Sequence, residues 1–134
     1  MNKILVVLVL AILFAVTSLA SSQTKVEWKE KDDFHKVMGQ TFHPVEDGNY
    51  APIRERSGEM LEKAIAWQNS SIPAEFANVT GLKENLAKLV AGSESLNNKI
   101  KASCTDEVIK TDLTALHDVF HEIVGSCQTT DHQH

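Results

Sequence analysis

The sequence predicts an all-α protein, an up-down-up-down four-helix bundle that follows a cleaved signal peptide. Apolar residues recur at steps of three and four in four separate stretches, and turn-forming residues separate those stretches. No run of alternating β-branched residues bounded by hairpin turns competes with this pattern. The chain has 134 residues, of which 43% are hydrophobic and 23% charged, which is enough for one globular domain and too little for two.

Residues 1–20 have the layout of a secretory signal peptide. Lys3 gives a positive start, residues 4–16 are almost wholly apolar, and Ser18 and Ala20 provide small side chains for cleavage. We therefore expect a periplasmic or secreted protein. An uncleaved membrane anchor is the alternative, although the apolar run is short for a bilayer. The predicted parts are a signal peptide, a bundle domain and a mobile polar tail, at residues 1–20, 21–127 and 128–134.

The charge balance and the absent motifs exclude several classes of function. The net charge is −5, and cleavage would remove Lys3 and make the chain more negative still. Nucleic acid is therefore not the expected partner, because phosphate binding needs a basic surface. No second apolar run is long enough to span a membrane, so no membrane contact is expected after cleavage. No phosphate-binding loop, nucleophile constellation or paired acid and base is present, and we expect no enzyme activity.

The first helix is expected over residues 24–42. Its apolar side chains repeat at steps of four and three residues, which places them on one helix face. These are Phe34, Met38, Thr41 and Val45, with Val37 and Phe42 beside them. Pro44 disfavours helical backbone at the residue before it, so this helix should end before His43.

The remaining helices follow from the same periodicity. The second should begin at Ala51-Pro52, where a proline in the first turn loses no hydrogen bond, and end by Asn69. The third should start from a cap at Thr80, and the fourth should run from a cap near Thr105 to Gly125. Their predicted core faces are, in order, Ile53, Ser57, Met60, Ala64 and Trp67; Leu82, Leu86, Leu89, Ser93, Leu96 and Ile100; and Ile109, Leu113, Leu116, Phe120 and Ile123.

Two cysteines, Cys104 and Cys127, flank the fourth helix. A helix of about 20 residues spans about 30 Å, whereas a disulfide needs Cα atoms within about 7 Å. The two thiols therefore cannot pair with each other across a continuous helix. Two partly buried thiols, an intermolecular disulfide and a ligand role remain open.

Histidine is abundant, with six copies, and two of them are spaced as metal ligands often are. His117 and His121 lie four residues apart, so they project from one helix face one turn apart. Such a pair offers two imidazoles to Zn, Cu, Ni or Co. Asp118 stands where the zinc-protease signature has Glu, so that catalytic motif is absent.

His35, on the first helix, is expected to face this pair. Both His35 and His117 take e positions of their heptads, and these flanks face each other when two helices run antiparallel. At 1.5 Å per residue they lie about 14 Å and 18 Å from the same end of the bundle, within one turn of each other. His43 or Met38 is the expected fourth ligand. Alternatively the histidines simply bridge core and solvent, and Met38 is a core residue.

With these residues placed, the chain resembles exported four-helix bundles of two kinds. One kind comprises the c-prime cytochromes and the soluble b-type cytochromes, and the other comprises periplasmic bundles that sense or bind metals through His and Met. The c-prime cytochromes carry Cys-x-x-Cys-His near the end of the fourth helix, whereas Cys127 is followed here by Gln128. Covalent haem attachment is therefore excluded.

The resemblance to b-type cytochromes implies a non-covalent haem b held between the first and fourth helices. Met38 and His121 lie on the helices that carry that family's Met and His ligands, but at about 9 Å and 24 Å from the same end. Ligation by His35 and His117 would fit better. The resemblance to the metal-sensing bundles implies one ion shared by His and Met side chains of the same two helices.

The sequence thus predicts an exported bundle that binds a transition-metal ion between its first and fourth helices, for sensing, buffering or delivery. The expected ligands are His35, His117, His121, His43 and Met38. Two alternatives stay open. One is a haem-binding electron carrier, and the other is a cofactor-free bundle that binds a protein partner or a second copy of itself.

Overall fold

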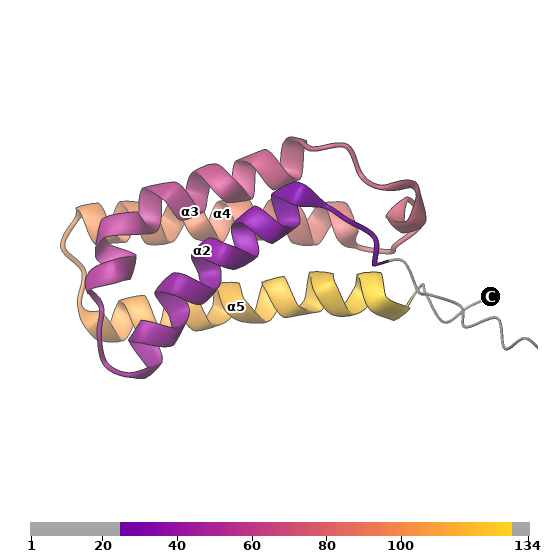
Figure 1. Ribbon diagram of the computed structural model, residues 1–134. Helices are drawn as coiled ribbons and strands as arrows, with labels where there is room; N and C mark the ends of the chain where they lie inside the picture. The colour runs from indigo at the N-terminus through magenta and orange to yellow at the C-terminus, as the bar shows by residue number, and fades with distance from the viewer. Residues whose placement is uncertain (1–24, 130–134) are drawn as a thin grey trace, which may run out of the picture.

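The computed structural model describes residues 25–129, which form an all-α four-helix bundle. The predicted signal peptide and residues 130–134 lie outside the described part of the chain. Four α-helices follow one another with alternating direction, and a single 3-10 turn, η1, lies in the connection between the second and third of them (Figure 1). The elements are α2 (Lys29–Glu46), α3 (Ala51–Asn69), η1 (Ala74–Phe76), α4 (Leu82–Lys101) and α5 (Asp106–Thr129).

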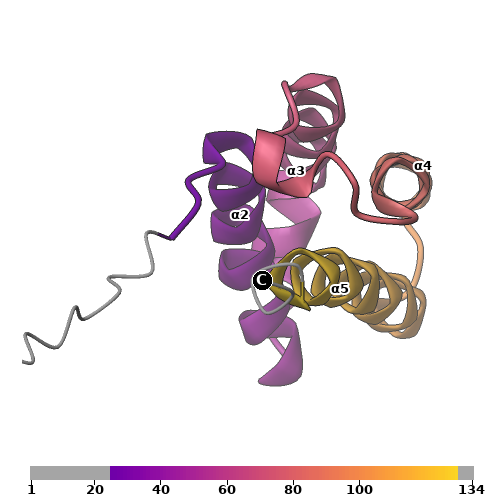
Figure 2. The same ribbon diagram turned by 90° about the vertical axis from the view of Figure 1, so that its right-hand side faces the viewer.

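Consecutive helices pack side by side, so that α3 lies between α2 and α4, and α4 packs against α5. Seen along α4 and α5, the four helices surround a common centre (Figure 2). The α2–α5 pair, which closes the bundle, is the least extensively packed of the four neighbouring pairs, and α2 runs obliquely across α5 (Figure 1). This oblique crossing decides which side chains of α2 meet α5.

The core consists of the apolar faces that periodicity predicts. Every predicted core residue of α3 and α5 is buried, and so are those of α4 except Ile100, which is partly buried. The predicted stripe on α2 is buried as well. Two further aromatic residues outside the helical stripes complete one end of the core, Trp28 before α2 and Phe76 in η1.

The predicted ends of the first helix are wrong at both termini. The helix begins at Lys29 instead of residue 24, because Trp28 has extended backbone (φ −136°, ψ 92°) and is only 2% exposed. It continues through Pro44 to Glu46. Proline in the last turn removes only one helical hydrogen bond, and continuing the helix buries Val45, which is 2% exposed.

The other helix ends agree more closely with the prediction. α3 spans the expected residues, and the Thr105 hydroxyl accepts a hydrogen bond from the Val108 backbone N–H at 3.4 Å, as a helix cap does. At α4 the cap position is taken by Gly81, with a φ of +77°, rather than by Thr80. α5 passes the predicted stop at Gly125 and ends at Thr129, because Cys127 in this extra turn packs in the core.

Since α5 is continuous, Cys104 and Cys127 lie at its two ends and do not form a disulfide with each other, as predicted. The two residues that follow Cys127, Gln128 and Thr129, belong to the helix. The predicted boundary between bundle and tail at residue 127 is therefore two residues too early.

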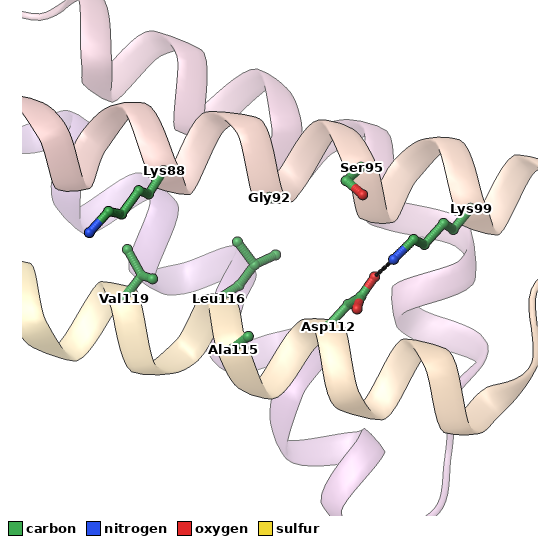
Figure 3. A pocket seen from close by; sticks show the side chains of 8 residues that line it. All are labelled: Lys88, Gly92, Ser95, Lys99, Asp112, Ala115, Leu116 and Val119. Atoms are coloured by element: carbon green, nitrogen blue, oxygen red, sulfur yellow. Dashed lines mark hydrogen bonds and ion pairs between the residues drawn. The ribbon is translucent and has the colours of Figure 1, made fainter.

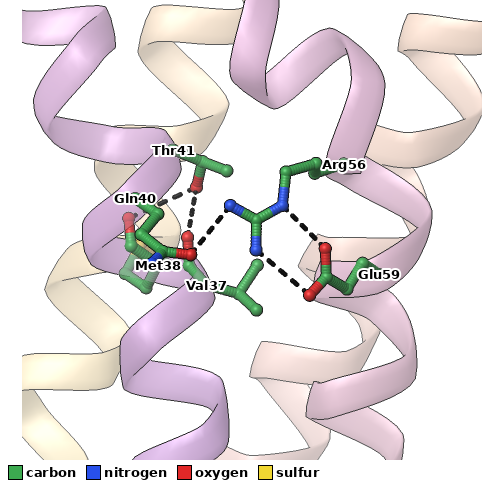
Figure 4. Close-up of polar contacts among 6 residues, drawn as sticks. All are labelled: Val37, Met38, Gln40, Thr41, Arg56 and Glu59. Carbon is green, nitrogen blue, oxygen red and sulfur yellow. Dashed lines mark hydrogen bonds and ion pairs between the residues drawn. The ribbon is translucent and has the colours of Figure 1, made fainter.

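Polar side chains join α2 to α3 along their outer edge (Figure 4). The Arg56 guanidinium donates to both carboxylate oxygens of Glu59, at 2.7 and 3.1 Å, and to the side-chain oxygen of Gln40 at 2.9 Å. Beside it on α2, the Thr41 hydroxyl donates to the Val37 carbonyl oxygen at 2.8 Å, which satisfies this buried group. The contact with Gln40 is exposed and those with Glu59 are partly buried, so each contributes about 1 kcal/mol or less.

Candidate metal site

The two histidines of α5 point at each other. Their Nε2 atoms are 3.1 Å apart, and their ring centroids are 4.4 Å apart with an angle of 73° between the rings. Without a metal, this distance is that of a hydrogen bond in which one neutral imidazole donates and the other accepts. The i,i+4 spacing thus brings two ring nitrogens of His117 and His121 to one point at the surface of α5, as predicted.

The orientation of His117 is set by the helix opposite. Its ring stacks on the Phe42 ring of α2, with centroids 3.9 Å apart and the planes 9° from parallel. Phe42 itself is buried at the edge of the core. His117 is half-buried and His121 is exposed. One imidazole of the pair is therefore held by packing, and the other is accessible from solvent.

Burial lowers the pKa of His117 below its ordinary value, and the neighbouring His121 lowers it further. The carboxylates of Asp118 and Glu46 act in the opposite direction, but they do not cancel the effect of burial. His117 is therefore neutral at neutral pH, and the neutral imidazole is the form that binds a metal ion.

This lowered pKa predicts how stability changes with pH. The unfolded chain binds a proton at His117 more readily than the folded chain does, so acid favours unfolding. The contribution of His117 is fully present above its ordinary pKa of about 6.5 and is lost as the pH falls below it. In urea unfolding at pH 7.5 and 5, the wild type should lose more stability on acidification than His117→Phe, which keeps the aromatic stack. An equal or smaller loss would contradict this assignment.

His43 lies near the pair but does not join it. Its Nδ1 is 3.0 Å from a carboxylate oxygen of Glu46 at the end of α2, and both side chains are exposed. Its ring lies 5.9 Å from that of Phe42, the ring on which His117 stacks. A carboxylate on Nδ1 is the outer partner that metal-bound histidines usually have, and it leaves Nε2 as the ligand atom.

His35 is not brought to the pair. It stacks on Phe120 at 4.9 Å, and Phe120 lies one turn beyond His117 along α5. The ring opposite His117 is Phe42, which lies two turns beyond His35 along α2. The counting that predicted a shared height assumed parallel axes, whereas α2 crosses α5 obliquely (Figure 1). His35 therefore meets α5 nearer its C-terminal end.

Met38 is a core residue, 1% exposed, and is not placed beside the exposed pair. Across residues 25–129, no group of three or more His, Cys, Asp or Glu side chains is gathered closely enough to hold a metal ion. The described residues show no feature that supports haem binding. His35 and His117, the expected haem ligands, each stack on a phenylalanine, and the space between α2 and α5 is filled by Phe34, Met38 and Phe120.

A separate groove of about 220 Å³ lies between α4 and α5 (Figure 3). Its floor is formed where Gly92 of α4 meets Leu116 of α5, so closely that a Cβ atom at residue 92 would lie 2.6 Å from the Leu116 Cδ2. An ion pair between Lys99 and Asp112, at 2.7 Å, closes one end. No histidine lines this groove.

Comparisons with known proteins identify no relative, so the function is inferred from the arrangement of the side chains. The chain matches no protein-family model, no curated protein and no solved structure at a significant level. Among the helices of residues 25–129, none has the length and apolar character needed to cross a membrane.

Proposed function

We propose that the protein binds a divalent transition-metal ion through His117 and His121 and holds it reversibly outside the cytoplasm. The observation that carries this proposal is the 3.1 Å separation of the two Nε2 atoms. Metal–nitrogen bonds of about 2.0–2.1 Å with an angle between 90° and the tetrahedral value require the two nitrogens to be about 2.9–3.4 Å apart. The two nitrogens therefore already have the separation of a chelate, and each ring has only to turn so that its lone pair points to the ion instead of to the other ring.

His43 is the nearest further ligand, and we include it as one that binds after the ion is in place. Its hydrogen bond to Glu46 is exposed, so turning the ring costs little. His35 and Met38 fall outside this revised ligand set, because one stacks on Phe120 and the other is buried.

A site with two preplaced ligands suits exchange better than permanent storage. Structural zinc sites are closed by four protein ligands, whereas open positions let an ion enter and leave. This supports sensing, buffering or delivery as the role. An exported location would place the site where metal ions arrive, and it rests on the predicted signal peptide of residues 1–20.

Calorimetric titration with zinc, nickel and copper tests this proposal. The wild type should bind at least one ion per two chains, and His121→Ala should weaken binding at least about tenfold, because chelation by two imidazoles is lost. His35→Ala is the matched control, since it removes an exposed histidine that contacts Phe120, as His121 does, but lies outside the pair. Equal affinity in the wild type and His121→Ala would refute the assignment.

A further inference from the structure

The site on α5 is incomplete within one chain. Zinc in protein sites takes four ligands in a tetrahedron, whereas His117 and His121 offer two. The described residues bring no third His, Cys, Asp or Glu to them. Because His121 is exposed and both Nε2 atoms meet at the surface, the open positions of a bound ion face outward from the bundle.

We propose that these positions are filled by the same histidine pair of a second copy, so that one metal ion joins two chains about a two-fold axis. This inference rests on the proposed metal binding. In such a contact the same surface serves both partners, so one sequence supplies all four imidazoles. Two pairs at the observed spacing complete a tetrahedral set, so in the dimer His43 of each chain stays on Glu46 and is not a ligand.

The surroundings of the pair make this association depend on the metal. The carboxylates of Asp118 and Glu46 act electrostatically on His117, and the chain carries a net charge of −5, so two copies repel each other. Within the described parts of α2 and α5, no large apolar side chain is exposed that could hold the copies together. The ion supplies both the ligand bonds and positive charge. The protein is then a monomer without metal and a dimer with it, which is a form of metal sensing.

Sedimentation velocity on the untagged protein, in chelator and then with zinc, tests the inference. We expect one chain in chelator, a doubled mass with zinc, and one zinc per two chains. His121→Ala should stay monomeric, and His35→Ala should dimerise like the wild type. A variant with His132→Ala and His134→Ala removes the last two histidines of the chain and should also dimerise.

The outcomes separate the two proposals. If zinc binds with the affinity expected of the pair while the mass stays that of one chain, the dimer is refuted and the metal site stands. If zinc does not bind, both proposals fall. A dimer that persists in chelator, or that forms with zinc in His121→Ala, would also overturn the metal-bridged contact.

Discussion

Replacing Trp67 with alanine is expected to lower the free energy of unfolding by about 3–5 kcal/mol. Trp67 is 0% exposed and its ring contacts three other aromatic rings, those of Trp28, Phe34 and Phe120, at 5.6–6.0 Å. Removing the indole leaves a cavity where α2, α3 and α5 meet. Such a loss is a large share of the about 5–15 kcal/mol by which small domains are stable.

Urea unfolding followed by far-UV circular dichroism measures this loss, and Trp67→Phe is the control. The Trp67 Nε1 has no hydrogen-bond partner among the described residues, so phenylalanine removes ring volume without breaking a hydrogen bond. Its loss should therefore be clearly smaller than that of alanine. Equal losses for the two variants would mean that the ring contacts are not what stabilises this end of the core.

Trp28→Ala is expected to cost about 3 kcal/mol, because it removes a buried indole that joins the start of α2 to the α3–α4 connection. The Trp28 ring stacks on Phe76 at 5.9 Å and meets Trp67 edge-on at 5.6 Å. Its Nε1–H donates a hydrogen bond of 2.8 Å to the Ser70 hydroxyl, which in turn donates to the Trp67 carbonyl oxygen.

The hydrogen bond and the ring packing can be separated in the same urea experiment. Trp28→Phe keeps a ring in the stack but loses the bond to Ser70 and part of the ring volume, so it should cost at least about 1 kcal/mol. Ser70→Ala removes the same bond from the other side. The loss in free energy of unfolding for the double variant Trp28→Phe/Ser70→Ala should then be smaller than the sum of the losses of the two single variants. Full additivity would show that the bond contributes nothing.

The periodic part of the fold could be predicted because a helix face repeats every three or four residues. The stripes from Ile53 to Trp67 and from Ile109 to Ile123 are buried as expected. Trp28 escaped prediction, since it precedes α2 and belongs to no repeat. The end of α2 was predicted wrongly because the effect of Pro44 on His43 concerns only the local backbone. The helix continues because it buries Val45 in the core, which is a tertiary effect.

For the site, the spacing of residues along one helix predicted which side chains meet, whereas heights counted along two different helices did not. The meeting of His117 and His121 follows from a separation of four residues on one helix. The approach of His35 depends on how α2 crosses α5, and that angle is set by side-chain packing along the whole interface. The stack of His117 on Phe42 depends on the same crossing. Phe42 could be recognised in the sequence only as a core residue.

The metal content of the untagged protein, purified without chelator from a host that exports it, separates metal binding by His117 and His121 from a purely structural role. We expect at least one zinc, copper or nickel ion per two chains in the wild type and none in the His117→Ala/His121→Ala variant. Iron with a Soret band would instead identify a haem protein. A wild-type protein that is empty and takes up no added metal would refute metal binding, and the two histidines would then be no more than a hydrogen-bonded pair on the surface of α5.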